Sequence, residues 1–292
     1  MTRVEPPHLA GTWYERSAED LARQTDALLA RAASPAFAGT AAAIVVPHAA
    51  YRYSGATAAV AYRILRDCGY RRAVILAPSH FLRYRGAAVL DVDAFATPLG
   101  EIAVDRSALD AIAGEALIRN APRVFRNEHA LEIQLPLLQR VLPQVAIVPL
   151  IVGDLEPDDC VAFAAVLARL TETGNTVLIV SSDFTHYGAD FDYLPFVPRD
   201  SKYVEAQLRA LDLGAIEHVR TGDFAGFRGY VARTGATICG REPLSALLAW
   251  RQRNLPAIGQ GVLLAYTTSL ALTGDFEHSV SYAALAFARV AV

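Results

Sequence analysis

Three short apolar runs in this chain stop abruptly at small or polar residues, and a histidine follows each of them. The runs and their histidines are 41–46 with His48, 73–77 with His80, and 177–180 with His186. Apolar runs without alternating polar positions are typical of parallel strands that are covered on both faces. Because ligands bind outside the carboxyl ends of such strands in open α/β sheets, we predict that these histidines converge on one site.

Segments with helical spacing of apolar positions separate these runs. The spacing predicts a further strand over 145–152 and helices over 17–31, 54–68, 106–117, 157–170, 202–211, 224–233 and 244–251. Two apolar segments, 87–92 and 102–104, flank a turn at 97–100 and are predicted to form an added hairpin. The fold class is therefore α/β, with a central mostly parallel or mixed sheet flanked by helices. A length of 292 residues fits one such unit, and we predict a single domain over 1–292.

The segment 127–138 carries titratable residues at the start of a helical pattern. Its apolar positions form one face of a helix, at residues 131, 135 and 138. We predict that Glu128, His129 and Glu132 point into the site from the start of this helix. Pro136 should kink the helix or mark a boundary within it, because proline cannot donate a backbone hydrogen bond.

Composition and charge exclude several classes of protein. The apolar fraction is 53%, and the net charge is −3 from 27 basic and 30 acidic residues, without the basic stripe that a nucleic-acid surface needs. The first residues lack the apolar core of a signal peptide, and the apolar stretch at 262–272 is too short to span a membrane. We therefore expect a soluble cytoplasmic protein that binds neither nucleic acid nor membrane.

The three cysteines do not suggest a disulfide framework. Cys68, in the last turn of a predicted helix, and Cys160 are expected to be packing residues. Cys239 precedes a predicted helix, whose dipole should lower the pKa of the thiol.

Four of the seven histidines stand at strand ends or at a helix start: His48, His80, His129 and His186. One such histidine could be a hydrogen-bonded structural residue, but four in matched settings, together with Cys239 and Asp183, favour a site. The other three, His8, His218 and His278, lack that setting and are expected to be surface or structural residues.

Two imidazoles and a thiolate suit iron, copper or zinc better than magnesium or calcium, which prefer oxygen ligands. If His129 and His186 are not ligands, they can act as general acid or base, because the unperturbed pKa of histidine is about 6.5. Asp183 either fixes the tautomer of His186 or of a ligand, or caps the end of its strand.

Several motifs resemble those of the MEMO family, which includes the bacterial and archaeal AmmeMemoRadiSam system protein B. They occur in the family's order along the chain, at residues 11–14, 46–55, 77–80, 128–136, 181–188, 238–241 and 279–284. Two positions depart from the family pattern: Ala50 is commonly glycine, and Thr185 is commonly cysteine in the animal members. Neither is a candidate metal ligand.

The resemblance implies a fold similar to that of the class III extradiol dioxygenases, which use non-heme iron. It implies metal ligands His48, His80 and Cys239, with the cysteine where those enzymes have a carboxylate. His186 would be the acid–base histidine, and His129 and Asp183 would line the cavity. The family name also implies a functional link to AMMECR1-like and radical SAM proteins.

Two functions follow as alternatives. In the first, the protein is a dioxygenase-like oxidoreductase that holds Fe(II), with Cu or Zn as other candidate metals, and acts on a small-molecule substrate with O2. In the second, the same pocket binds iron, copper, a peptide or a partner without turnover. A zinc hydrolase is a third hypothesis, because zinc accepts these ligands.

Aromatic residues beside the motifs suggest the walls of the pocket. Trp13 is predicted either to anchor the core or to line the pocket, and Tyr51 and Tyr187 are expected to line it as well. The aromatic and proline-rich segment 189–200 is either a loop that covers the pocket or a plain surface loop.

Overall fold

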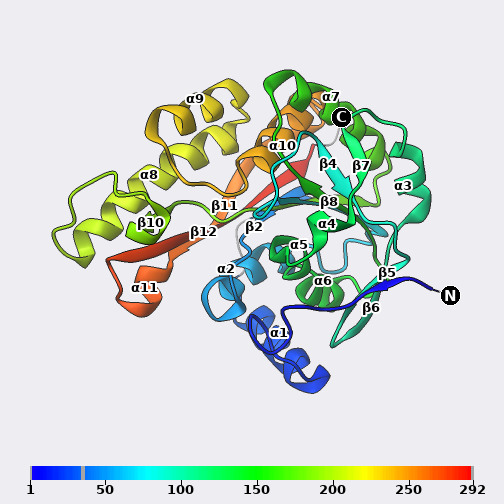
Figure 1. The fold of residues 1–292 in the computed structure, drawn as a ribbon, viewed down its shortest axis with the longest axis horizontal. Helices are drawn as coiled ribbons and strands as arrows, with labels where there is room; N and C mark the ends of the chain where they lie inside the picture. Colours follow the sequence, from blue (N-terminus) through cyan, green and yellow to red (C-terminus); the bar gives the residue numbers. More distant parts are fainter. Residues whose placement is uncertain (1, 34–36, 291–292) are drawn as a thin grey trace.

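The computed structural model describes residues 2–33 and 37–290 and has a mixed β-sheet at its centre (Figure 1). Among the described residues this sheet has nine strands in the order β10-β12-β2-β9-β3-β8-β4-β7, with β11 paired to β12. Its strands are β2 (Ala41–Val46), β3 (Arg72–Pro78), β4 (Ala87–Val89), β7 (Ile118–Asn120), β8 (Ala146–Val152), β9 (Thr176–Ser181), β10 (His186–Gly188), β11 (Ile258–Thr268) and β12 (His278–Arg289). The central strands β2, β9, β3 and β8 are parallel, whereas β12 runs antiparallel to β2, β10 and β11. The predicted α/β class with a mixed sheet is confirmed.

Helices cover the sheet and fill the connections between strands. They are α1 (Ala18–Arg31), α2 (Tyr51–Arg63), α3 (Arg106–Ile112), α4 (Pro122–Phe125), α5 (His129–Glu132), α6 (Leu135–Val141), α7 (Pro157–Thr171), α8 (Ser201–Thr221), α9 (Phe224–Thr234), α10 (Arg241–Arg253) and α11 (Ser269–Thr273). The helix α10 packs on β3, β9 and α7, and α2 packs on β2, β11 and β12. None of the described helices has both the length and the apolar character needed to cross a membrane.

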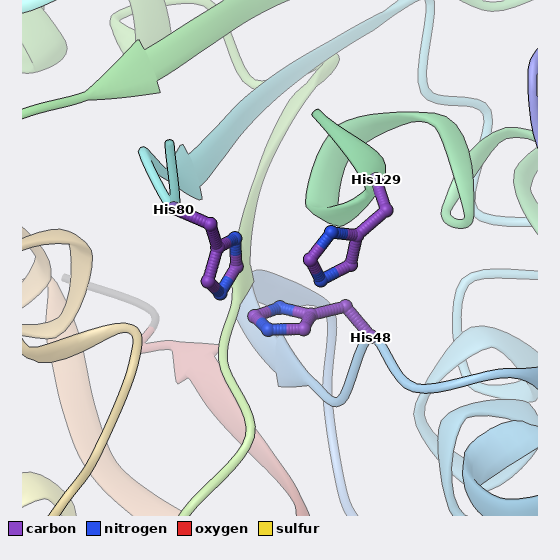
Figure 2. Close-up of side chains that lie close together, drawn as sticks. All are labelled: His48, His80 and His129. Atoms are coloured by element: carbon purple, nitrogen blue, oxygen red, sulfur yellow. The ribbon is translucent and has the colours of Figure 1, made fainter. Parts of the chain in front are cut away.

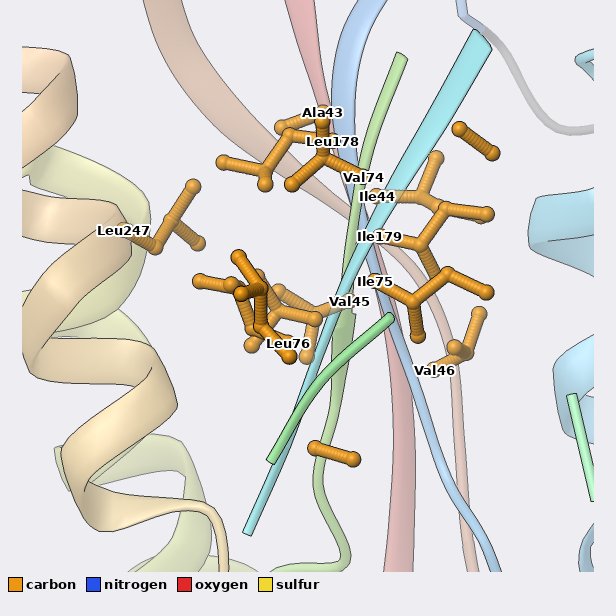
Figure 3. Packing of buried hydrophobic residues seen from close by; sticks show 14 of the residues in the cluster. Ala43, Ile44, Val45, Val46, Val74, Ile75, Leu76, Leu178, Ile179 and Leu247 are labelled. Carbon is orange, nitrogen blue, oxygen red and sulfur yellow. The ribbon is translucent and has the colours of Figure 1, made fainter. Parts of the chain in front are cut away.

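The apolar runs of the central strands form the core between these helices (Figure 3). Every residue of β2 and of β9 is buried. Leu76 and Leu178 point toward α10, whereas Ile44 and Ile75 point to the opposite face, as the two-residue repeat of a strand requires (Figure 3). Since each fully buried aliphatic side chain contributes about 1.5–3 kcal/mol relative to exposure, these unbroken runs hold the strand ends in fixed positions.

The predicted hairpin forms from different residues. The strands β5 (Ala94–Thr97) and β6 (Gly100–Ala103) pair with each other, and the short β1 (Val4–Glu5) joins β5. The segment 87–89 instead becomes β4 of the main sheet. Two acidic residues end that apolar run: Asp91 pairs with the guanidinium of Arg3, and Asp93 accepts a hydrogen bond from the Arg3 backbone. These acidic residues therefore divide the predicted strand 87–92 from the hairpin that follows it.

Several helix boundaries also differ from those predicted. The helix α2 begins at Tyr51 and ends at Arg63, so Cys68 lies in the turn that follows and not in a last helical turn. The left-handed backbone of Asp67 and Gly69 prevents the helix from continuing through this turn. The helix α3 ends at Ile112, five residues early, and α8 continues ten residues beyond position 211 to Thr221.

Pro136 marks a boundary, as predicted. The helix α5 ends at Glu132, and Pro136 is in the first turn of the next helix, α6. The proline is tolerated there because the first backbone N–H groups of a helix have no partner within the helix. The break lets α5 turn its N-terminal residues toward the end of the sheet independently of α6.

Candidate functional site

A cavity of about 820 Å³ lies beyond the carboxyl ends of the central strands. His48 follows β2, His80 follows β3, and Asp183 follows β9. Because these parallel strands end at the same edge of the sheet, the three residues meet there. All six predicted site residues line this one cavity: His48, His80, His129, Asp183, His186 and Cys239. Residues that are up to 191 positions apart in sequence are thereby brought together.

Three of these histidines form a tight cluster (Figure 2). His48, His80 and His129 each offer a ring nitrogen, and these atoms all lie within 4.8 Å of one another. The rings of His80 and His129 are stacked with centroids 4.3 Å apart, and the ring of His48 meets both edge-on. His186 lies outside this cluster but on the wall of the same cavity.

The hydrogen bonds of His48 define its tautomer. The hydroxyl of Ser181 donates to the carbonyl of Ala130 at 2.7 Å, so its oxygen accepts from Nδ1–H of His48 at 2.8 Å. The lone pair of His48 is therefore on Nε2, which lies 3.0 Å from Sγ of Cys239. Burial, and then the neighbouring His80, hold the pKa of His48 well below its usual value.

His80 and His186 have the same tautomer for similar reasons. Nδ1 of His80 lies 2.9 Å from the Glu128 carboxylate, which also accepts from the His80 backbone N–H at 2.8 Å. Nδ1 of His186 lies 3.0 Å from the carbonyl oxygens of Phe184 and Thr237, which can only accept. Both rings therefore donate from Nδ1 and keep the Nε2 lone pair for a metal or a proton.

Buried carboxyl groups hold the cluster in place. Burial acts to raise the pKa of Glu128, but hydrogen bonds from His80 and Ala130 outweigh it and keep that pKa below its ordinary value. Burial raises the pKa of Asp183 to about 7. Asp183 accepts from the His48 backbone N–H at 2.8 Å, so it caps the strand end and fixes the His48 main chain, whereas carbonyl oxygens fix the His186 tautomer.

His129 is covered by an aromatic side chain from the start of the chain. The ring of Trp13 lies 4.6 Å from the ring of His129, and Trp13 lines the cavity. Burial, and then the neighbouring His80, lower the pKa of His129 to about 4, so its imidazole is neutral near pH 7. Trp13 combines the two predicted roles, because it lines the pocket and, partly buried, also packs against the core.

The prediction that the helix dipole lowers the pKa of the Cys239 thiol is wrong. Burial, and then the nearby Asp183 carboxyl, raise the pKa of the Cys239 thiol well above its usual value. Sγ accepts a hydrogen bond from the Asp183 backbone N–H at 3.3 Å, but this contact does not offset the loss of solvent. A cation bound at Sγ would reverse this balance, because a coordinating thiol is deprotonated.

Three residues that were predicted to face the site point elsewhere. Glu132 accepts hydrogen bonds from the N-terminal segment, Tyr51 donates to the carbonyl of Ile133, and Tyr187 is buried in a second apolar cluster against Phe196. These side chains stand within the motifs, but their elements turn them away from the cavity.

His278, which was predicted to be a surface or structural residue, lines the cavity. Antiparallel pairing of β10 and β12 sets Gly188 opposite His278, and Phe191 lies between the rings of His186 and His278. No apolar run precedes His278, so strand pairing alone could have identified it. Phe191 shows that the segment 189–200 does reach the cavity.

Asp212 anchors the loop that carries His186 although no motif pointed to it. It is fully buried on α8 and accepts hydrogen bonds from the Thr185 backbone N–H at 3.0 Å and from the Tyr266 hydroxyl at 2.7 Å. Burial raises the pKa of Asp212 above its ordinary value, against the opposing effect of these hydrogen bonds.

Asp212→Asn is therefore expected to flatten the pH dependence of stability. The folded state holds the Asp212 proton more tightly than the unfolded chain, so this contribution is full below about pH 3.9 and is lost as pH rises through the folded pKa. Urea unfolding of the wild type and of the variant across this range measures the difference, with the exposed Asp110→Asn as control. Parallel profiles for all three proteins would contradict the prediction.

The fold and the cavity define a class: an α/β protein with imidazole, thiol and carboxyl groups gathered at the carboxyl edge of a mixed sheet. A family model described as Memo-like protein matches residues 5–286. The chain therefore belongs to the Memo family, as its motifs indicated.

Known relatives match over most of the chain. The chain is 31% identical to the protein memo-1 homolog of Caenorhabditis elegans over 280 residues, which cover 94% of this chain and 79% of that protein. It is 30% identical to protein MEMO1 of Danio rerio over 284 residues, 94% of each chain. It is 29% identical to protein MEMO1 of Homo sapiens over 244 residues, which cover 82% and 81%.

Proposed function

We propose that this protein binds a transition metal through His48, His80 and Cys239 and acts as a non-heme iron oxidoreductase. The observation that carries the proposal is the orientation of the donors: both histidines donate from Nδ1 and keep a lone pair on Nε2, and Nε2 of His48 lies 3.0 Å from the sulfur of Cys239. Two imidazoles and one thiolate suit iron, copper or zinc. The resemblance to extradiol dioxygenases makes Fe(II) the first candidate.

The hydrogen-bond partners of the two imidazoles support this donor set. Ser181 and Glu128 each take the Nδ1 proton of one histidine, which fixes the ring and makes Nε2 a better donor. The cavity walls include Trp13, whose ring lies 4.6 Å from that of His129, and Phe191, whose ring lies 5.0 Å from that of His186. A cavity of about 820 Å³ has room for a small-molecule substrate together with O2.

When bound, iron would supply the redox chemistry and the activation of O2. The chain's own residues would bind the substrate and move its protons. Burial lowers the pKa of His186, and its Nε2 is neutral and unpaired among the described residues, so it can take a proton from a substrate hydroxyl. His129 and Asp183 would line the substrate face and adjust its charge.

A second candidate function is binding of iron or copper, or of a peptide or partner, without turnover. The thiol at Cys239 favours it, because a sulfur ligand softens the site toward copper. Action in the cytoplasm remains a proposal from the sequence, and a link to AMMECR1-like and radical SAM proteins remains a proposal that rests on the family resemblance.

The first experiment is the metal content of protein purified without oxygen. About one iron per chain is expected in the wild type, with loss in His48→Ala and Cys239→Ala and retention in His278→Ala, which lines the cavity outside the cluster. Retained metal in both ligand variants would place the site elsewhere. O2 uptake by the iron form with catechols, thiols and ascorbate then separates the oxidoreductase from the binding protein.

His129→Ala resolves the ligand set in the same experiment. The cluster of three imidazoles could itself hold a metal, because the ring nitrogens of His48, His80 and His129 lie within 4.8 Å of one another. We expect His129→Ala to keep the metal. Loss of the metal in His129→Ala, with its retention in Cys239→Ala, would assign the metal site to the three histidines instead. A zinc-dependent hydrolytic activity would support the third hypothesis, a zinc hydrolase.

A further inference from the structure

Thr237 makes an unusual set of contacts with His186. Its hydroxyl accepts a hydrogen bond from the His186 backbone N–H at 2.9 Å and donates one to the His186 carbonyl at 2.6 Å. His186 is the first residue of β10, whose other edge pairs with β12 through Val280. Within residues 2–33 and 37–290 no strand pairs with β10 at the Thr237 side, so one hydroxyl takes the place of a strand partner.

The main chain of Thr237 also holds the His186 ring. Its carbonyl oxygen lies 3.0 Å from Nδ1 of His186 and shares the ring proton with the carbonyl of Phe184. Backbone and side chain of His186 are thus fixed by one residue. A shift of Thr237 would move the main chain of His186 and remove one of the two acceptors of its Nδ1 proton at the same time.

The same short segment carries Cys239. Hydrogen bonds from Ile238 N to Ala236 O, at 2.9 Å, and from Arg241 N to Ile238 O, at 3.2 Å, fold residues 236–241 into successive tight turns. Sγ of Cys239 contacts Nε2 of His48 at 3.0 Å. One short segment therefore joins Cys239, which contacts His48, to Thr237, which holds His186.

We propose that Thr237 is a positioning residue that couples the orientation of His186 to the occupation of Cys239 by metal. The coupling rests on the proposed function, because it takes Cys239 as a ligand. A cation at Sγ fixes the segment 237–239, and the hydroxyl and carbonyl of Thr237 then hold the His186 ring with Nε2 toward the cavity. Because coupling between two sites is reciprocal, loosening His186 also weakens metal binding.

The test compares three variants. Thr237→Val keeps the shape and removes the hydroxyl, and Thr237→Ser restores it. The control, Thr234→Val, removes a hydroxyl that donates to Tyr230 O and accepts from Ala236 N, without contact to His186. If the valine variant does not fold, Thr237→Ala takes its place.

The first readout is the ring of His186 in metal-free protein, observed by ¹H–¹⁵N NMR. The wild type, Thr237→Ser and Thr234→Val should show one tautomer protonated at Nδ1, and Thr237→Val should show averaged ring signals. A merely structural Thr237 would lower stability without changing the tautomer. A wild-type His186 signal in Thr237→Val overturns the positioning role.

The second readout is titration with Zn²⁺, a diamagnetic probe. Zn²⁺ should shift the His186 signals in the wild type and in Thr237→Ser, with a smaller shift in Thr237→Val and an affinity weaker by about 10-fold. Equal affinity and equal shifts in Thr237→Val overturn the coupling. If Cys239 does not bind Zn²⁺ in the wild type, both the proposed ligand set and the coupling are overturned. The spectra of the metal-free protein still decide whether Thr237 positions His186.

Discussion

Replacing Gly240 by alanine is expected to destabilise the protein by about 2–3 kcal/mol and to displace Cys239, because it overpacks the contact between this segment and the end of β9. A Cβ at Gly240 would lie 2.3 Å from Cβ and 2.3 Å from Oγ of Ser182, and 3.0 Å from the carbonyl oxygen of Ser181. Neither the Ser182 Cβ nor the Ser181 carbonyl is the end of a flexible side chain. The backbone of Gly240 has φ −83°, so the cost is steric and not conformational.

Displacement of Cys239 also predicts a loss of metal. Urea unfolding measures the stability of Gly240→Ala, and metal content measures the site in the same protein. The control, Gly229→Ala, lies within α9 with nothing within 4 Å of the new Cβ, and should stabilise the protein by about 0.5–1 kcal/mol. Ser182→Gly in the Gly240→Ala background removes both clashing side-chain atoms and should restore part of the loss. Wild-type stability and metal content in Gly240→Ala would contradict the packing argument.

The convergence of the histidines could be predicted because the signal is local. An unbroken apolar run such as 41–46 is a buried strand, and the residue after it lies at the edge of the sheet whatever the rest of the chain does. Parallel neighbours then bring the ends of β2, β9 and β3 together. The same few apolar runs were enough to predict the fold class, which the structure confirms.

Side-chain direction at the edges of the site could not be predicted in this way. Glu132 and Tyr51 stand in the motifs, but each points away from the cavity because its helix is set by packing against elements far away in sequence. His278 reaches the cavity through a strand register, Gly188 opposite His278, that the sequence does not display. At Cys239, burial raises the pKa of the thiol more than the helix dipole can lower it. Burial depends on the complete fold, which the local sequence does not show.

Replacing Glu132 by glutamine is expected to destabilise the protein by about 2–3 kcal/mol, because it removes a buried carboxylate that accepts three hydrogen bonds and sets an amide NH₂ against a donor. The carboxylate accepts from Leu9 N–H at 2.9 Å and from the Tyr14 hydroxyl at 2.5 Å through one oxygen, and from His8 N–H at 2.9 Å through the other. All three partners are donors. An amide can face them with one oxygen only, so its NH₂ group must oppose either His8 or the pair of Leu9 and Tyr14.

The same change should release Trp13 from the site. Glu132 ties down residues on both sides of Trp13, whose carbonyl accepts from Tyr51 N–H at 2.9 Å and whose ring lies 4.6 Å from that of His129. The chain has two tryptophans, so in a Trp250→Phe background the emission comes from Trp13 alone. In that background Glu132→Gln should shift the emission to longer wavelength and increase quenching by acrylamide.

Tyr14→Phe is the matched control for the carboxylate. It removes one of the three donors and leaves both backbone hydrogen bonds to Glu132 in place, so we expect a loss of about 1 kcal/mol and little change in Trp13 emission. Equal effects of the two variants would mean that the tyrosine hydroxyl, and not the carboxylate, secures the segment. Unchanged stability and quenching in Glu132→Gln would mean that Trp13 is held over His129 by its ring packing alone, since the backbone anchor on Glu132 would then be dispensable.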